Sequence, residues 1–492
     1  MRDLYIQNSL SKKKEKFTPI EEGYVGMYVC GPTVYSDVHL GNVRTFVSFD
    51  VMYRFLLFLG YKVRYVRNIT DVGHLLDNGE DRVSKRATLE KLEPMEIVQK
   101  YSNSFHTMMD VFNTKKPSIE PRATQHIIEQ IEMVQQIMDN GYAYAKNGSV
   151  YFDTIKFHTE KKSYGHLSGR VIEDLLTETR DDLKNQSEKK HPSDFAIWMK
   201  AAPEHIMKWN SPWSVGFPGW HLECSVMSTK YLGDKFDIHG GGNDLKFPHH
   251  ENEVAQNVGA CNCDPANYWL HTNMLLMNGR KMSKSDGNTI SPEELFSGES
   301  PHVSKGYTPM AVKFFMLQSH YSSTLDLTDG GMQASEKGYR RLMMALTTLK
   351  SLETTSDDGA LDNEILSLLD EMIGHMCDDF NTPKAIASAF ELVSKINSMK
   401  DSHININGLS KDALSKLKTI LPQFVYDILG LQNDMDNADN DVLSGVMDLI
   451  IELRQDARTN KNWDTSDKIR DGLAKNKITI KDGKDGTSWS VS

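Results

Sequence analysis

The sequence lacks a long hydrophobic run. No uninterrupted apolar stretch reaches the roughly 18 to 20 residues that a helix needs to cross a bilayer. The first residues, Met-Arg-Asp-Leu-Tyr-Ile, have neither the apolar core of a signal peptide nor the acid-free composition of a transit peptide. We therefore expect no membrane partner and, by default, a cytoplasmic location.

Cysteine and positive charge are also scarce. Five cysteines in 492 residues are too few for a disulfide framework, and their number is odd, so we expect reduced thiols, some of them open to metal binding. The chain has 56 Lys and Arg against 67 Asp and Glu, a net charge of −11. This balance argues against indiscriminate nucleic-acid binding but permits a local basic site.

The chain does have the length of several domains and the pattern of an α/β protein. Residues 25–30 are a short apolar run ended by Gly-Pro, residues 40–59 have helical spacing, and residues 62–69 alternate like a strand. Strand, helix and strand in this order open a parallel, doubly wound sheet. The α/β pattern resumes at 236–239, and a polar, acidic linker is predicted at 433–441.

We therefore predict an α/β protein: a Rossmann-type parallel-sheet catalytic domain with a connective insertion, followed by an α-helical bundle and a small C-terminal domain. The predicted bounds are 1–112 for the first half of the Rossmann domain, 113–215 for the insertion, 216–308 for the second half, 309–432 for the bundle and 433–492 for the C-terminal domain.

Two short signatures predict a nucleotide site. Residues 30–42 read Cys-Gly-Pro-Thr-Val-Tyr-Ser-Asp-Val-His-Leu-Gly-Asn, and residues 281–285 read Lys-Met-Ser-Lys-Ser. The first leads from a strand into a helix, whose N-terminus offers backbone N–H groups and a positive dipole end to phosphates. Alone, the first segment could be an ordinary turn and the second a solvated loop. Together, in this order around an α/β domain, they favour ATP.

Each residue type in these signatures has a chemical reason to be there. Glycines allow close approach of the backbone, a histidine can hydrogen-bond phosphate oxygens, and lysines can stabilise the charge that builds on a leaving pyrophosphate. The candidate ATP-binding residues are Gly31, His39, Gly41, Asn42, Lys281, Ser283, Lys284 and Ser285. The candidate catalytic residues are His39, Lys281 and Lys284.

A second set of residues indicates a metal site. Cys30, Cys224, Glu253 and either His249 or His250 could converge, because residues three or four apart share a helix face. Spacing alone does not choose between the two histidines. Two thiolates, an imidazole and a carboxylate suit zinc better than magnesium. The alternative is a pair of buried structural cysteines and a polar helix cap.

Along nearly its whole length the chain resembles the cysteinyl-tRNA synthetases, a class I aminoacyl-tRNA synthetase family. The resemblance rests on the two signatures and on a series of further segments in one order. These are Arg67-Asn68-Ile69-Thr70-Asp71, Pro121-Arg122-Ala123-Thr124, Ser193-Asp194-Phe195-Ala196-Ile197-Trp198, Asp237-Ile238-His239-Gly240-Gly241-Gly242, Phe247-Pro248-His249-His250-Glu251-Asn252-Glu253, Asp378-Asp379-Phe380-Asn381-Thr382-Pro383 and Gly486-Thr487-Ser488-Trp489.

The resemblance implies a cysteine–tRNA ligase: ATP-dependent formation of cysteinyl-adenylate from L-cysteine, then transfer to the 3′-terminal ribose of tRNA(Cys). It implies one Zn²⁺ held by Cys30, Cys224, His249 and Glu253, and Mg²⁺ accompanying ATP. The zinc would select the substrate thiolate, which we expect to join as a fifth ligand or to displace Glu253. The cysteine pocket implied by the resemblance comprises Cys30, Thr70, Trp220 and His239. The C-terminal domain would bind the anticodon, and a monomer is expected.

One residue departs from the usual signature, which ends in histidine where this chain has Asn42. Asparagine can donate a hydrogen bond but cannot become cationic. Two other interpretations stay open: a paralogous ligase that transfers cysteine to an amino-sugar, and a non-catalytic binding protein built on a decayed synthetase. The presence of a C-terminal region argues against the first, and the retention of His39, Lys281 and Lys284 argues against the second.

Overall fold

The chain divides into two compact units, Met1–Gln432 and Asn433–Ser492. The computed structural model describes residues 2–73, 82–170, 188–282, 287–476, 478–483 and 486–491. No helix within these ranges is long and apolar enough to cross a membrane.

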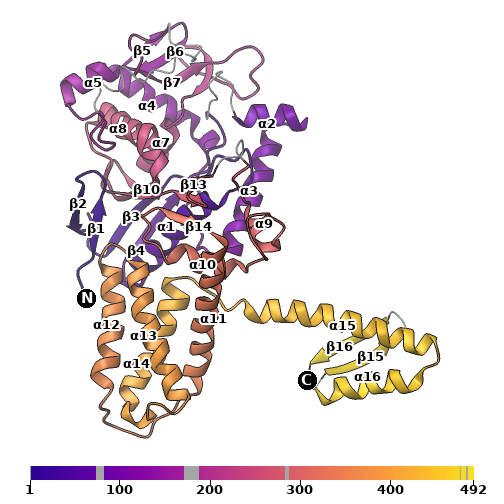
Figure 1. Cartoon of the computed structure of the whole chain (residues 1–492). Coiled ribbons are helices and arrows are strands. Elements are labelled where there is room, and N and C mark those ends of the chain that lie inside the picture. The colour runs from indigo at the N-terminus through magenta and orange to yellow at the C-terminus, as the bar shows by residue number, and fades with distance from the viewer. Residues whose placement is uncertain are drawn as a thin grey trace. The chain divides into compact units, whose positions relative to one another are not determined.

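A four-stranded parallel sheet is the centre of the first unit, with strand order β11-β10-β3-β4 (Figure 1). Its strands are β3 (Tyr24–Val29), β4 (Lys62–Arg67), β10 (Phe236–Gly242) and β11 (Ala266–Thr272). From β3 the chain passes through helix α1 (Leu40–Phe58) to β4 on one side, whereas β10 pairs with β3 on the other side. The strand order therefore reverses between β3 and β10, and in such sheets ligands bind at this point, beyond the carboxyl ends of the strands. The predicted Rossmann-type opening is confirmed.

Helix α1 lies close against this sheet because a glycine stands at the contact. A Cβ atom on Gly240 of β10 would lie 2.2 Å from the ring of Phe49 in α1. The same helix begins directly after His39 and ends before Gly60, which has a φ of +87°. The N-terminus of α1 is thus fixed over the carboxyl edge of the sheet.

An antiparallel sheet lies between the two halves of the parallel sheet in sequence, with strand order β5-β6-β7-β9-β8. Its strands are β5 (Ala143–Lys146), β6 (Ser149–Phe152), β7 (Phe195–Lys200), β8 (Trp209–Asn210) and β9 (Val215–Pro218). The helices around it are η1 (Ala123–His126), α4 (Ile127–Asp139), α5 (Thr154–Lys161), α7 (Leu222–Leu232) and α8 (Glu251–Cys261). Two short turns, η3 (Asn243–Leu245) and η4 (Lys246–His250), precede α8.

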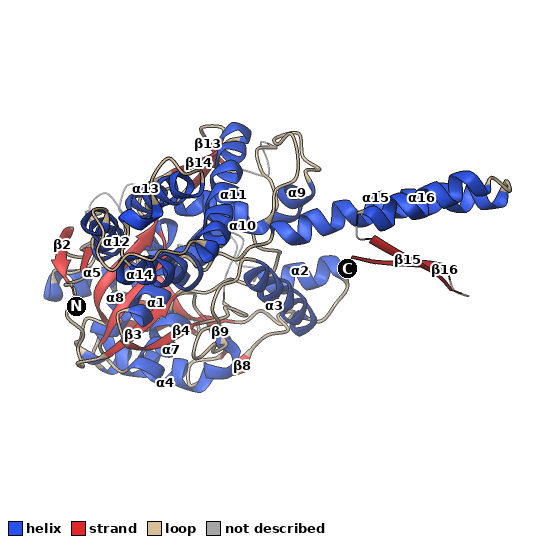
Figure 2. Cartoon of the chain, turned by 90° about the horizontal axis from the view of Figure 1, so that it is seen from below, coloured by secondary structure: helices blue, strands red, loops and turns tan. Residues whose placement is uncertain are grey.

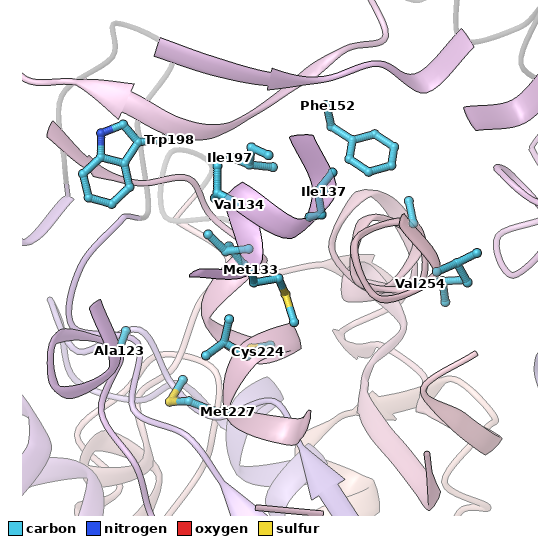
Figure 3. Packing of buried hydrophobic residues seen from close by; sticks show 14 of the residues in the cluster. Ala123, Met133, Val134, Ile137, Phe152, Ile197, Trp198, Cys224, Met227 and Val254 are labelled. Carbon is cyan, nitrogen blue, oxygen red and sulfur yellow. The ribbon is translucent and has the colours of Figure 1, made fainter. Parts of the chain in front are cut away.

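One hydrophobic cluster joins this insertion to the parallel sheet (Figure 3). It contains Ile137 of α4, Phe152 of β6 and Trp198 of β7, which are fully buried. Met227 and Cys224 of α7 belong to the same cluster. The thiol of Cys224 is therefore held on a helix that also packs Leu222, Val226 and Met227 into this apolar cluster, and such packing restricts its movement.

Shorter elements frame the sheet. The N-terminal hairpin consists of β1 (Tyr5–Asn8) and β2 (Lys13–Lys16), and a small sheet of order β13-β12-β14 consists of β12 (Leu275–Met277), β13 (Arg280–Lys281) and β14 (Leu325–Leu327). Three further helices are α2 (Arg82–Glu90), α3 (Pro94–Val111) and α9 (Pro292–Ser297).

A helical bundle completes the first unit, as the sequence predicts for the region after residue 309. Its elements are α10 (Pro309–Leu317), α11 (Asp329–Ser351), α12 (Asp362–Cys377), α13 (Thr382–Lys400), η5 (Ile406–Gly408), α14 (Lys411–Pro422) and η6 (Gln423–Ile428). Helices α11 to α14 lie side by side in Figures 1 and 2. Most of their buried residues are leucine, isoleucine, methionine and alanine, as in helical bundles generally.

The second unit contains helices α15 (Met435–Thr459) and α16 (Trp463–Lys475) and an antiparallel hairpin of β15 (Ile478–Gly483) and β16 (Gly486–Val491). The linker predicted at 433–441 is wrong, because α15 already begins at Met435. Acidic side chains are favourable in the first turns of a helix, where they meet the positive end of its dipole. The acidic run was therefore compatible with a helix start as well as with a linker.

Candidate metal and nucleotide site

Four potential metal ligands meet beyond the carboxyl end of β3. Cys30 follows β3 directly, and Cys224 lies in the first turn of α7. His249 lies in the irregular turn η4, and Glu253 lies in the first turn of α8. All four are buried, and one ligand atom of each lies within 4.8 Å of those of the others. The structure thus brings together the four residues that the resemblance implies as zinc ligands.

The spacing of these atoms fits a tetrahedral ion. The sulfur of Cys30 lies 3.7 Å from the sulfur of Cys224 and 3.6 Å from Oε1 of Glu253. Nε2 of His249 lies 3.3 Å from the sulfur of Cys224 and 3.2 Å from Oε1 of Glu253. Zinc bonds of about 2.0 to 2.3 Å in tetrahedral arrangement place the ligand atoms roughly 3.3 to 3.8 Å apart. The donor set and its dimensions therefore fit a zinc ion.

A second group of buried residues overlaps the first and contains His239 and His250 beside Cys30 and Glu253. Nε2 of His239 lies 2.8 Å from Oε2 of Glu253, which is a hydrogen-bond distance and too short for two atoms bound to one zinc. Nε2 of His250 lies 4.0 Å from Oε1 of Glu253. The geometry therefore favours His249 as the ligand, the choice that spacing alone leaves open.

Burial and mutual contact set the charge of the group. Burial raises the pKa of Glu253, but His239 and His249 outweigh it and lower this pKa to about 2. Burial also raises the pKa of Cys224, yet the hydrogen bond with Cys30 and the charge of His249 bring it to about 7. Burial, together with Cys224, raises the pKa of Cys30 well above its usual range. A divalent cation would compensate the buried negative charge that these groups carry as ligands.

The predicted cysteine pocket surrounds these four residues. The ring of Trp220 lies 4.9 Å from the ring of His249, and the ring of His239 stacks on Trp269 at 4.2 Å with an angle of 13°. No hydrogen-bond partner for Nδ1 of His239 occurs among the described residues, although the ring is fully buried. Trp220 and His239 therefore pack directly around the candidate metal ligands.

Thr70, the remaining predicted pocket residue, connects to the site through a glutamate. Its hydroxyl donates to Oε1 of Glu223 at 3.2 Å and accepts from the side-chain amide of Asn68 at 2.9 Å. Asn68 also accepts a hydrogen bond from the backbone N–H of Gly31 at 2.8 Å. A Cβ on Gly31 would lie 1.6 Å from the carbonyl oxygen of Asn68, so only glycine permits this approach. The loops after β3 and β4 are thereby held together.

His39 and Asn42 form the N-terminal cap of α1. The backbone N–H of Asn42 donates to Nδ1 of His39 at 3.3 Å, and the side-chain oxygen of Asn42 accepts from the backbone N–H of His39 at 3.5 Å. A Cβ on Gly41 would lie 3.0 Å from the His39 ring, which explains the glycine. In this cap Asn42 serves as an acceptor, a role that does not need the positive charge of a histidine.

The second signature lies at the edge of the small sheet. Lys281 is exposed on β13, whereas Ser283, Lys284 and Ser285 lie outside the described residues. Beyond them, the side chain of Asn288 donates to the carbonyl oxygens of Met277 and Lys281, each at 3.3 Å. These bonds hold Asn288 against the backbone of Met277 and Lys281.

Several residues of the site escape sequence reasoning. Glu223 is buried, and burial together with Cys224 raises its pKa well above the usual range. Asn68, Trp269 and His271 also contact the site, the last through Nδ1 of His250 at 2.9 Å. Asn68 does lie within a segment that carries the family resemblance, and Glu223 directly precedes the predicted ligand Cys224. Their contacts, however, depend on which strand ends are neighbours, which one sequence does not state.

Comparison with known proteins places this geometry in a family. Residues 16–337 match the family model of the class I (C) tRNA synthetase catalytic domain, and residues 372–433 match the DALR domain. The chain is 49% identical to the cysteine–tRNA ligase of Phocaeicola vulgatus, with 99% of each chain covered. It is 50% identical to that of Bacteroides thetaiotaomicron, again with 99% of each covered.

Solved structures agree at the level of the fold. Methionyl-tRNA synthetase of Mycobacterium tuberculosis in complex with methionyl-adenylate has a TM-score of 0.57 at 14% identity, covering 82% of this chain and 89% of that one. LeuRS of Agrobacterium radiobacter K84, in a ternary complex with tRNA and LeuAMS, has a TM-score of 0.58 at 13% identity, covering 84% of this chain and 85% of that one. The sheet, the site and these likenesses together show that the chain belongs to the cysteine–tRNA ligase family of class I aminoacyl-tRNA synthetases.

Proposed function

We propose that this chain activates L-cysteine with ATP and transfers the cysteinyl group to tRNA(Cys). The observation that carries the proposal is the juxtaposition of two sites at one sheet edge. Cys30, Cys224, His249 and Glu253 form a buried donor set, and Cys30 opens the same segment that ends in the His39 cap of α1. An amino acid held by the first site would present its carboxylate to a nucleotide held by the second.

The four donors would hold zinc as the specificity element. Zinc bound there would favour a substrate thiolate strongly over the neutral hydroxyl of serine, because a coordinating thiol is deprotonated outright. A pocket that senses only shape separates cysteine from serine poorly, whereas translation needs roughly 10⁴-fold discrimination, about 5.5 kcal/mol. Trp220 and His239 would exclude water and orient the amino acid beside the ion.

The residues of the two signatures would act on the phosphates. In the first step a carboxylate oxygen of cysteine attacks the α-phosphorus of ATP; the new P–O bond forms as the bond to pyrophosphate breaks. His39, Lys281 and Lys284 would stabilise the charge on the phosphate oxygens, with Gly31, Gly41, Asn42, Ser283 and Ser285 completing the ATP site. Mg²⁺ would accompany the nucleotide, bound mostly by phosphate and water.

In the second step the 2′-hydroxyl of the terminal tRNA ribose attacks the acyl carbon, and AMP leaves. The second unit, 433–492, would meet the anticodon, while 309–432 would support the tRNA between anticodon and active site. The remaining proposed domains are 1–112, 113–215 and 216–308, and we propose that the protein acts as a monomer in the cytoplasm. No side chain needs to form a covalent intermediate, because positioning and charge stabilisation suffice.

Cysteine-dependent ATP–pyrophosphate exchange and charging of tRNA(Cys), with serine as competitor, test the proposal. Wild type should hold one zinc per chain and charge cysteine. Cys224→Ser should lose zinc and most of its preference for cysteine over serine, whereas Cys261→Ser, at an exposed thiol, should match wild type. Exchange without tRNA charging would favour transfer to another acceptor, such as an amino-sugar. Full zinc content and unchanged selectivity in Cys224→Ser would refute the zinc assignment.

A further inference from the structure

A chain of three hydrogen bonds runs from the candidate zinc site to the N-terminal hairpin. Nε2 of His250 lies 3.3 Å from the sulfur of Cys30, and Nδ1 of the same ring lies 2.9 Å from Nε2 of His271. Nδ1 of His271 lies 2.8 Å from Oγ of Ser9. His250 is fully buried and His271 is 6% exposed, so water does not compete for the inner bonds.

The three residues come from separate parts of the fold. His250 ends the turn η4 before α8, His271 lies on β11, and Ser9 follows β1. The backbone of Ser9 is held in place because its N–H donates to the carbonyl of Trp269 at 2.9 Å. Three elements thus converge on one line of hydrogen bonds, which makes an accidental alignment of mobile side chains a poor explanation.

The direction of this line is set at its inner end. A metal-bound thiolate has no proton and can only accept, so Nε2 of His250 must donate to Cys30. In a neutral ring Nδ1 must then accept, which requires Nε2 of His271 to donate. Nδ1 of His271 must accept in turn, and the Ser9 hydroxyl is its donor. His271 stays neutral, because burial first, and then Lys246 and His239, lower its pKa to about 3.

We propose that Ser9 and His271 are positioning residues that fix the tautomer of His250, so that its Nε2–H donates to the thiolate of Cys30. This inference rests on the proposed zinc site and adds an outer shell to it. A hydrogen bond to a thiolate withdraws electron density from the sulfur, and such outer partners orient ligands and tune the metal. His250 is thereby a donor to a ligand and not a ligand itself.

Cobalt in place of zinc gives a direct spectroscopic test. The thiolate-to-cobalt charge-transfer band depends on the electron density of sulfur, so loss of the donated hydrogen bond should move it to longer wavelength. His271→Met removes the donor to His250 and should shift the band and weaken zinc binding about 10- to 100-fold. His271→Gln, whose amide nitrogen can stand at the position of Nε2, should stay near wild type. Ser9→Ala should give a smaller shift in the same direction.

Ser11→Ala is the matched control, because Ser11 lies in the same turn and accepts from the backbone N–H of Lys13. Equal bands and equal zinc affinities in wild type, His271→Met and Ser9→Ala would overturn the proposed role of Ser9 and His271, as would a band shift in Ser11→Ala as large as that in Ser9→Ala. If His271→Met does not fold, Ser9→Ala and His271→Gln decide alone. A wild-type protein that binds neither zinc nor cobalt would instead refute the proposed zinc site.

Discussion

At the scale of single residues, His39 has two tasks on two atoms of one ring. Nδ1 accepts from the backbone N–H of Asn42, which can only donate. In the neutral ring the proton must therefore be on Nε2, where it can donate to a phosphate oxygen. The helix cap thus fixes the tautomer that the proposed chemistry requires, and Asn42 supports this cap through its side-chain oxygen.

Two substitutions should separate these tasks. His39→Asn retains an acceptor near the position of Nδ1 but removes the outer donor, so cysteine-dependent ATP–pyrophosphate exchange should fall by about 10²- to 10³-fold with little change in melting temperature. His39→Gln retains a donor near Nε2 and loses the cap. It should therefore lower the free energy of unfolding by about 1 kcal/mol and should reduce ATP–pyrophosphate exchange less than His39→Asn does. Exchange kinetics and thermal denaturation of both variants check this. A reversed order of the two activities would contradict the assignment.

The residue scale also shows where sequence reasoning stops. Cysteine, histidine and glutamate are the right donors for zinc, but spacing leaves His249 and His250 equivalent. In the structure they lie in η4, where Phe247 has φ −139° and ψ 132°, so regular helical periodicity does not apply before α8. Consequently only the fold shows that His249 faces Cys224 while His250 faces Cys30.

At the scale of elements, one arginine connects the two signature regions. Arg44 is on α1 and is buried, and no carboxylate among the described residues pairs with it. Its guanidinium donates to the carbonyl oxygens of Asn273 and Met274, which lead into β12, and to those of His320 and Ser323, which precede β14. The planar guanidinium of Arg44 therefore connects α1, the helix that follows His39, to the small β13-β12-β14 sheet that contains Lys281.

Arg44→Lys should weaken this tie without removing the charge. A single ammonium cannot reach four carbonyls on two segments, and small displacements of catalytic groups are costly, so kcat/KM for ATP should fall by about 10- to 100-fold. Arg64→Lys is the control, since Arg64 is exposed on β4 and donates to one carbonyl, that of Tyr231. ATP–pyrophosphate exchange at varied ATP concentration measures kcat/KM for ATP in both variants. Equal kcat/KM values for Arg44→Lys and Arg64→Lys would contradict the role of Arg44.

A buried lysine joins α1 to the end of the bundle. Nζ of Lys313 on α10 lies 3.3 Å from Oδ2 of Asp50 and donates to the carbonyl oxygens of Phe112 and Gly430, each at 3.0 Å. Lys313→Met removes one buried donor from all three acceptors, although Asp50 keeps its ion pair with Arg54 and the carbonyl of Gly430 keeps the side-chain amide of Asn113, and should cost about 2 kcal/mol of unfolding free energy. Lys416→Met, which breaks only the exposed pair with Asp412, should cost less than about 0.5 kcal/mol. Denaturant unfolding measures the free energy of unfolding of both variants. Similar losses in Lys313→Met and Lys416→Met would show that the buried contacts of Lys313 add no more stability than an exposed ion pair.

Elements differ in how far the sequence predicts them. Strands β3 and β4 are predictable because they are apolar or alternating runs bounded by turn residues. Strands β12 and β13 have three and two residues, too few to show any period, and they escape prediction although the second signature begins at Lys281 of β13. The acidic run at 433–441 predicts a linker where α15 begins, because polar composition describes a linker and a helix N-terminus equally well.

At the scale of the whole molecule, the first unit contains every residue that we propose for the first chemical step. The parallel sheet, the four candidate ligands, His39 and Lys281 all lie before Gln432. The core of this unit is closed as well: Leu429 and Leu431 are fully buried, and the carbonyl of Gln432 accepts a hydrogen bond from Tyr339. A chain that ends after Gln432 should therefore keep its own core.

Truncation after Gln432 should separate activation from transfer. Cysteine-dependent ATP–pyrophosphate exchange should stay within about twofold of wild type, because the active site keeps its supporting core. Charging of tRNA(Cys) should fall by at least about 100-fold in kcat/KM, the factor that roughly 2.7 kcal/mol of lost contact free energy represents. Both assays on the truncated and the full chain, with circular dichroism to check folding, measure this division.

The point variant Trp463→Ala controls for indirect effects of truncation. Trp463 is 58% exposed at the start of α16, and stacking of a base on an aromatic ring is worth about 1 to 3 kcal/mol. If the second unit meets the anticodon loop through this surface, the variant should raise the KM for tRNA about tenfold and leave exchange unchanged. Equal loss of exchange and charging on truncation would show instead that the second unit supports the active site, because a unit that acts only through tRNA contacts cannot affect a reaction that contains no tRNA.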